Sequence, residues 1–411
     1  MAPDDANWTA SATPLAIAAS AALFVRVGQW LIAIGTARSR NAASAVARGL
    51  LDIALATIAF WTIGAAIGFS SSNAFFSIDP HRLFGRDALG PSQILLALPM
   101  ILIAPAIATA ASAERSRFLV PCAVSIVLAV FVVPIAGRWC GLLGSTGWLV
   151  ALGFRDAAGA ASIHLVGAVA AIVAAVMVGP RNGKYHTDGS ASIIPGHSLP
   201  LVALGAALMV IGWLPYAAIR SASPLNGFAL LNALLAAAAG AVAATVLSWR
   251  QYGKVDVMLV IGGLLAGLIS SAASGAASPA WAALLVGAVC GLLVATMTTT
   301  LDLRVHIDDV GGLIVPHGTG AVVGLVTASA LAPGTVLDRM RSLGVQLLGI
   351  ASVVVLTVTF TYLTLLLLRA TTGLRSTEAD EFDGLDLAEH DVNAHPDFQQ
   401  TMIKSYHLRE A

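Results

Sequence analysis

Long apolar runs, broken only by short polar segments, make up most of this 411-residue chain. A transmembrane helix needs about 20 predominantly apolar residues to cross the hydrocarbon core of a bilayer. Eleven stretches meet that length. The pattern therefore predicts an all-α, polytopic membrane protein with helices over 14–35, 47–69, 93–113, 118–137, 157–179, 200–218, 224–248, 255–273, 279–300, 312–331 and 342–368.

The composition supports this interpretation, since 57% of the residues are hydrophobic and only 11% are charged. A soluble chain carries about a quarter charged residues. We expect residues 1–372 to form one membrane domain and residues 373–411 to form a polar tail. The formal net charge is zero, which gives no reason to expect a nucleic-acid partner.

A short polar motif occurs twice within these apolar runs. Asp156 precedes His164 by eight residues, and Asp309 precedes His317 by eight residues. Both copies read Asp-x7-His-x2-Gly-Ala-Val, and they lie 153 residues apart. This repeat indicates an internal duplication.

The duplication predicts two halves, over about 14–179 and 200–331, with 342–368 as an extra helix. Each half would hold five spans. Because five is odd, the second half must enter the membrane from the opposite side, which gives the inverted repeat common among transporters. The working site of such a repeat lies near the midplane, where the halves meet.

The two histidines are the strongest candidates for function. Polar side chains in the bilayer core are costly and usually mark a conduction or proton path. Symmetry would bring His164 and His317 together as a donor and an acceptor for a small polar solute in a narrow pore. The alternative is a packed, neutral imidazole. Asp156 and Asp309 are expected to cap the starts of their helices, and Asp156 could also attract a cation.

Enzyme and metal sites find no support in the sequence. No His-Glu-x-x-His helix, Gly-x-Ser-x-Gly motif or phosphate-binding glycine loop is present. We therefore expect no enzymatic activity, no metal and no cofactor.

Lys and Arg in the predicted loops and tail number fourteen on one side of the membrane and seven on the other. Because cytoplasmic loops carry the excess of these residues, this difference predicts an N-terminus outside and a cytoplasmic C-terminus.

Several segments, together with the duplicated motif, resemble the ammonium transporter (Amt/Mep/Rh) family. They are Arg38-Ser39-Arg40-Asn41-Ala42, Ala59-Phe60-Trp61, Ala113-Glu114-Arg115-Ser116-Arg117-Phe118, Gly212-Trp213 and Gly384-Leu385-Asp386-Leu387-Ala388-Glu389-His390. The resemblance implies a homotrimer in the plasma (inner) membrane. It also implies that each subunit has its own ammonium/ammonia pore, lined by His164 and His317.

The resemblance also implies a vestibule that recruits ammonium through aromatic rings and a hydroxyl group. Tyr216 stands where an inner Phe is expected, Met100 where an outer Phe is expected, and Arg220 where Ser is common. A ring face attracts a cation by about 0.5–2 kcal/mol, which a thioether does not replace. Arg220 would repel a cation unless it is a surface or subunit-interface arginine. The implied substrate-binding residues are Asp156, Trp139, Tyr216, Met100, Trp213 and Arg220.

Three functions are compatible with these residues. The first is an ammonium/ammonia transporter, the second is an ammonium sensor of the same fold with little conduction, and the third is an Rh-like neutral gas facilitator. The resemblance further implies that the tail docks on neighbouring subunits and responds to a PII-type signalling protein. The implied regulatory residues are Gly384, Asp386, Glu389 and His390.

Overall fold

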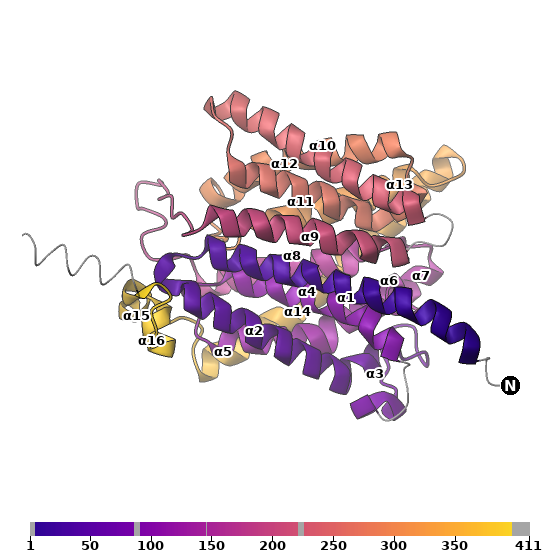
Figure 1. Cartoon of the computed structure of the whole chain (residues 1–411), viewed down its shortest axis with the longest axis horizontal. Helices are drawn as coiled ribbons and strands as arrows, with labels where there is room; N and C mark the ends of the chain where they lie inside the picture. The colour runs from indigo at the N-terminus through magenta and orange to yellow at the C-terminus, as the bar shows by residue number, and fades with distance from the viewer. Residues whose placement is uncertain (1–4, 86–90, 145, 221–225, 397–411) are drawn as a thin grey trace, which may run out of the picture.

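The structure, a computed structural model, describes residues 5–85, 91–144, 146–220 and 226–396. Long helices lie side by side with their axes roughly aligned (Figure 1). Ten described helices are long and apolar enough to cross a membrane. A shorter apolar helix, α13 (Ile314–Ala330), occupies the place of the span predicted at 312–331. The described residues contain no β-strand, so the predicted all-α membrane fold is confirmed.

The spans of the first half are α1 (Asp5–Thr36), α2 with η2 and α3 (Ala42–Ala59, Phe60–Gly64, Ala65–Gly68), α4 (Pro91–Ala111), α5 with η4 and α6 (Leu119–Val127, Leu128–Val132, Val133–Cys140), and η5 with α8 (Ala160–Leu165, Val166–Val178). The later long helices are α9 (Leu199–Arg220), α10 (Asn226–Tyr252), α11 (Val257–Ser274), α12 (Ala280–Leu303) and α14 (Val336–Thr371), with the shorter α13 before α14. Short helices complete the described chain: η1 (Ser39–Asn41), η3 (Pro80–Gly85), α7 (Trp148–Ala151), η6 (Gly275–Ala277), α15 (Glu378–Asp383) and α16 (Leu385–His390).

Three spans of the first half contain a π-helical turn, namely η2, η4 and η5. Such turns are rare and often occur at functional sites. His164 lies in η5, whereas His317 lies in the regular helix α13. The two halves therefore differ in backbone geometry at equivalent histidines.

The helices that carry the histidines run in opposite directions. Arg181, just after α8, pairs with Asp308, just before α13. At the other end of these helices, Asp156 before η5 and Ala328 near the end of α13 line the same pocket. The end of one helix thus meets the start of the other, as an inverted repeat requires.

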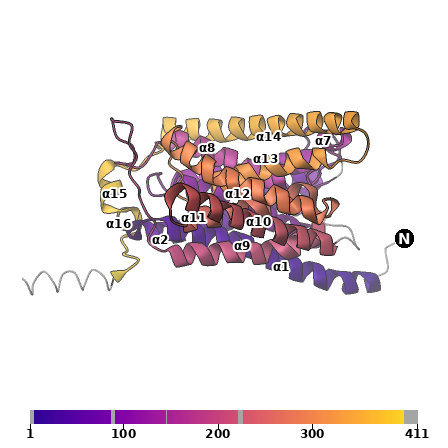
Figure 2. The same cartoon turned by 90° about the horizontal axis from the view of Figure 1, so that it is seen from above.

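Small residues allow the closest helix contacts. Gly28 of α1 faces Gly205 of α9, where any side chain would collide with backbone. Lipid provides no hydrophobic drive between helices, so close backbone approach supplies much of their packing. Helix α14 lies along one side of the bundle (Figure 2). Its buried residues form a single stripe, whereas apolar side chains such as Leu347 and Leu363 face outward.

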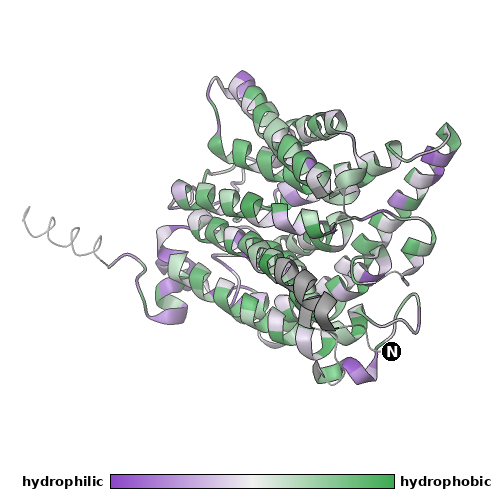
Figure 3. Ribbon diagram, turned by 45° about the vertical axis from the view of Figure 1, so that its right-hand side comes forward, coloured by the Kyte–Doolittle hydropathy of each residue, from purple (hydrophilic) through white to green (hydrophobic). Residues whose placement is uncertain are grey.

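Apolar colour covers most of the helix surfaces, and hydrophilic colour gathers toward the ends of the bundle (Figure 3). The start of α1 lies at the opposite end of the bundle from α15 and α16 (Figure 1). This arrangement suits a chain whose N-terminal and C-terminal segments leave a membrane on different sides.

Candidate pore and its end pockets

His164 and His317 form a direct pair in the core of the bundle. Their Nδ1 atoms lie 2.9 Å apart, and the side chains are 1% and 0% exposed. One Nδ1 must carry the shared hydrogen while the other accepts it. In a neutral pair, the donor ring then has an accepting Nε2 and the acceptor ring has an Nε2–H. Neither Nε2 has a hydrogen-bond partner among the described residues. The pair can therefore offer one donor and one acceptor to a small solute.

Two aromatic residues of α9 connect this pair to the segment around Asp156. The Trp213 ring lies 5.0 Å from the His164 ring, and the Tyr216 ring lies 5.2 Å from the Trp213 ring. The Tyr216 hydroxyl donates to the carbonyl of Ala158 at 3.3 Å. Their three-residue spacing puts both rings on one face of α9. These contacts bring the predicted residues Tyr216, Trp213 and His164 together.

A pocket of about 410 Å³ opens where η5 begins, and we call it the Asp156 pocket. The Asp156 carboxylate accepts hydrogen bonds from the backbone N–H groups of Gly159 and Ser162, each at 3.0 Å, and from the Ser162 hydroxyl at 2.8 Å. The predicted capping role is therefore confirmed. The pocket is lined by Cys140, Gly141, Val150, Phe154, Arg155, Asp156, Ala157, Arg220, Ala273, Ser274, Ala277, Ala328 and Leu331.

Arg220 contributes to the lining of this pocket. Its Nε donates to the carbonyl of Ala157 at 3.2 Å. Ala157 follows Asp156 in the chain, so Arg220 is bonded to the segment that leads into η5. Arg155 lines the same pocket. Two arginines and one aspartate therefore give this lining an excess of positive charge.

Two other predicted vestibule residues lie outside the lining of the Asp156 pocket. Met100 is 2% exposed within α4. The Trp139 indole N–H donates to the carbonyl of Phe75 at 2.6 Å, and its ring meets Trp148 edge-on at 5.8 Å. Phe75 stacks on Trp148 at 5.4 Å. This aromatic cluster has no signal in the sequence, because Phe75 and Trp148 follow different spans.

A second pocket, of about 490 Å³, lies where α13 begins, and we call it the Asp309 pocket. Asp309 accepts from the backbone N–H of Gly312 at 3.0 Å and of Ile314 at 2.8 Å, which confirms the second capping prediction. Burial raises the pKa of the Asp309 carboxyl to about 6. The charged and polar residues that line the Asp309 pocket are Thr36, Arg181, Lys184, Thr298, Asp302, Asp308 and Asp309.

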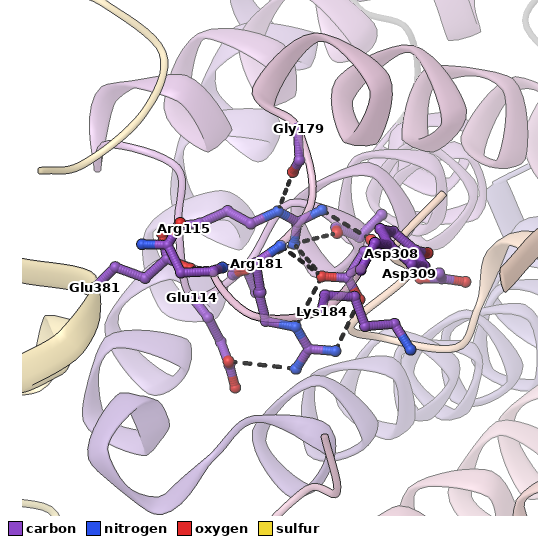
Figure 4. A network of polar contacts seen from close by, with 12 residues as sticks. Glu114, Arg115, Gly179, Arg181, Lys184, Asp308, Asp309 and Glu381 are labelled. Atoms are coloured by element: carbon purple, nitrogen blue, oxygen red, sulfur yellow. Dashed lines mark hydrogen bonds and ion pairs between the residues drawn. The ribbon is translucent and has the colours of Figure 1, made fainter. Parts of the chain in front are cut away.

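Ion pairs join several loops at this pocket (Figure 4). Arg181 pairs with Asp308 at 2.8 Å and with Glu114 at 3.3 Å, and Arg38 pairs with Glu114 at 2.6 Å. Arg115 donates to the carbonyl of Asp308 at 2.8 Å. Burial alone would raise the pKa of Asp308, but hydrogen bonds from Arg181 and the nearby arginine charges lower it to about 2. Sequence reasoning missed this network because its members lie in separate loops.

The predicted regulatory residues meet the start of α2. The Asp386 carboxylate accepts from the backbone N–H groups of Ala43 at 3.0 Å and Ser44 at 2.7 Å. Glu389 contacts Arg48 through both carboxylate oxygens, at 2.9 and 2.8 Å. A carboxylate at a helix N-terminus satisfies free N–H groups and opposes the helix dipole. The tail therefore docks on α2.

The other two regulatory residues complete this contact. The His390 ring meets Phe118 edge-on at 5.4 Å. Gly384 has φ +105°, and a side chain there would collide with Arg40. All four residues contact their own chain, because the turn at Gly384 brings α16 directly onto α2.

Known proteins resemble this chain along most of its length. Residues 13–395 match the Ammonium Transporter Family. Ammonium transporter Amt2 of Archaeoglobus fulgidus is 30% identical over 92% of this chain and 86% of its own length. Ammonium transporter Amt2 of Haloferax mediterranei is 30% identical over 91% and 87%.

Solved structures agree with these relatives. One of them, named "Sensor Amt Protein", is 30% identical, superimposes with a TM-score of 0.87, and covers 92% of this chain and 97% of its own. Saccharomyces cerevisiae Mep2, 23% identical with a TM-score of 0.79 and covering 89% and 87%, shares the fold. The chain is a multi-pass membrane protein that belongs to the ammonium transporter family.

Proposed function

We propose that this chain conducts ammonia nitrogen through a pore whose narrow part is the His164–His317 pair. The single observation that carries the proposal is the buried Nδ1–Nδ1 contact at 2.9 Å, which leaves both Nε2 atoms without a described partner. Ammonia has one lone pair and three N–H bonds. It can therefore donate to one Nε2 and accept from the other, whereas a neutral pair offers ammonium only one acceptor.

The proposed route begins at the Asp156 pocket and ends at the Asp309 pocket. Ammonium reaches the first pocket and gives up its proton before the histidines. Nitrogen then passes as ammonia, and the proton crosses separately. The excess of Lys and Arg in the loops on the tail side supports an Asp156 pocket outside the cell and a cytoplasmic Asp309 pocket.

The second candidate function is ammonium sensing with little conduction. Arg220 in the Asp156 pocket favours it, because a permanent guanidinium charge opposes cation recruitment. A similar solved structure that is named as a sensor Amt protein also supports it. An Rh-like neutral facilitator would tolerate the same pocket. Relatives are named as transporters, and we propose no enzymatic step.

We also propose that residues 1–372 act as the transport domain and that the tail, residues 373–411, is cytoplasmic and regulatory. Contacts of Asp386 and Glu389 with α2 support the second role. The family suggests a homotrimer in the plasma membrane and a PII-type protein as regulator. Cross-linking in native membranes would test the trimer.

An ammonium pulse applied to proteoliposomes separates the three functions. Electrical current together with internal pH change supports transport with separate proton passage. A pH change without current supports the neutral facilitator. Ammonium binding with neither signal supports the sensor. Protein-free liposomes provide the background for ammonia that crosses the lipid unaided.

A further inference from the structure

A buried ion pair lies within the membrane-spanning helices, away from the proposed route. Arg26 of α1 pairs with Asp52 of α2, and their side chains are 2% and 1% exposed. The Ser125 hydroxyl of α5 donates to the same carboxylate. None of these residues lines the Asp156 or the Asp309 pocket. Charged side chains inside a membrane are costly and are rarely without function.

Helix α2 links this pair to the docked tail. Ser44, Arg48 and Asp52 recur every four residues, so they share one face of α2. Arg48 pairs with Glu389 of the tail, and Asp52 pairs with Arg26. Negative and positive charges therefore alternate from the tail into the membrane.

Arg48 depends on the tail for its charge partner. Its side chain is 5% exposed, and Glu389 is the carboxylate that pairs with it in the described chain. Its other hydrogen-bond partners are neutral, namely the Ser44 and Ser116 hydroxyls and the Ser116 carbonyl, and its guanidinium also lies over the Phe118 ring at 5.7 Å. Removing one member of a buried ion pair is strongly destabilising, because it leaves an uncompensated charge. When the tail leaves, the nearest carboxylate along this face of α2 is Asp52, one turn deeper.

We propose that Arg48 couples tail docking to the intramembrane pair, with Glu389 and Asp52 competing for its guanidinium. In the docked arrangement Glu389 holds Arg48 and Asp52 holds Arg26. In the released arrangement Asp52 turns toward Arg48 and its hold on Arg26 weakens. Helix α1 packs on α9, which carries Trp213 and Tyr216. This coupling deepens the regulatory role proposed for the tail and rests on it.

The competition makes opposite predictions for the two members of the pair. Asp52→Asn removes the competitor, so the tail should stay docked longer. Arg26→Gln frees Asp52 to take Arg48, so the tail should leave more often. Coupling energies of this kind correspond to about 5- to 150-fold changes in an equilibrium constant. A simple packing role would shift both variants in the same direction or neither.

Hydrogen–deuterium exchange of the α16 backbone amides measures tail release in the full chain in lipid nanodiscs. We expect exchange at least about fivefold slower in Asp52→Asn and at least about fivefold faster in Arg26→Gln. Ser270→Ala, a buried polar change in α11, should match the wild type. Shifts of the same sign in both charge variants, or no shift, would overturn the proposal.

The double variant Arg26→Gln/Asp52→Asn controls for misfolding of the single variants. It removes both charges, so neither is left buried without its partner. It also lacks the competitor, so its exchange should be slowed as in Asp52→Asn. Wild-type or faster exchange in a folded double variant would overturn the coupling. Exchange is read without ammonium, so this result is independent of the transport assay. If the charge variants exchange at the wild-type rate while ammonium flux is normal, only the coupling is refuted. If exchange changes as predicted but the wild type carries no flux, only the transport function is refuted.

Discussion

The Nδ1 atoms of His164 and His317 lie 2.9 Å apart, although 153 residues separate the two histidines in the chain. Their helices run antiparallel, and equivalent positions of the two halves meet in the core. One shared hydrogen fixes complementary roles for the two Nε2 atoms. The pair is therefore a single polar unit rather than two independent side chains.

Removing either histidine should disrupt this unit. An unsatisfied buried polar group costs about 1–3 kcal/mol, so His164→Ala and His317→Ala should each change ammonium flux or selectivity about tenfold or more. The double variant should be no worse than the sum of the single changes. Proteoliposome flux measures this, with exposed-loop His186→Ala as the control. If either histidine variant keeps wild-type flux and selectivity, the pore role is contradicted and the histidines only pack in the core.

Arg220→Ser tests charge in the Asp156 pocket. Removing the guanidinium should lower the half-saturating ammonium concentration, by about fivefold for a repulsion of about 1 kcal/mol. Arg155→Ser removes the same charge from an exposed side chain of the same pocket and should have a smaller effect. Uptake over a concentration series gives both values. An unaltered half-saturation point in Arg220→Ser would contradict repulsion by this residue.

Met100→Phe is expected from sequence to add to that effect by restoring a ring. The structure changes this expectation, because Met100 is 2% exposed in α4 and does not line the Asp156 pocket. Overpacking a core usually costs about 1–3 kcal/mol. We predict a lower thermal unfolding midpoint with little change in ammonium affinity. A stable variant with tighter ammonium binding would restore the expectation from sequence.

Deleting residues after Arg375 should lower flux without unfolding the membrane domain. The truncation removes Asp386 and Glu389 from the start of α2 and Glu381 from its pairing with Arg375. The spans themselves stay complete. Flux and thermal stability should be measured on the same preparation, with Glu389→Gln as a milder variant. Full flux in the truncated protein would refute a regulatory tail.

Asp309 should take up a proton near pH 6, since burial raises its carboxyl pKa to about 6. An unfolded Asp titrates near 3.9. The folded state therefore binds this proton first, and the Asp309 contribution to stability should rise as pH falls from about 6 to about 4. Infrared difference spectra should show a carboxylic acid band with a midpoint near pH 6. The band should vanish in Asp309→Asn and persist in Asp308→Asn, because the Asp308 pKa of about 2 keeps that group ionised.

The fold followed from sequence because apolar length and the repeated motif are both local signals. The positions of Asp156 and Asp309 at the starts of predicted spans were enough to predict that they cap their helices. The π-helical turn at His164 could not be predicted, because it depends on packing and not on periodicity. The contact between His164 and His317 was predicted from the symmetry of the duplication, and the structure contains this contact.

Contacts between distant loops were beyond the reach of the sequence. In the sequence, three charged residues lie in separate loops, and only the fold brings them into contact: Arg181, Asp308 and Glu114. A usable signal was present for Arg26 and Asp52, which are opposite charges inside two apolar runs. Trp139 matched a family position by order along the chain, but its indole binds the Phe75 carbonyl instead of lining the Asp156 pocket.

Current recorded from proteoliposomes during an ammonium pulse, for the wild type and for His164→Ala/His317→Ala side by side, tests conduction through the histidine pair most directly. We predict a wild-type current that saturates with ammonium and is lost or loses its selectivity over potassium in the double variant. A wild-type protein that binds ammonium but gives neither current nor pH change, or a double variant with unaltered current and selectivity, would contradict conduction through this pair.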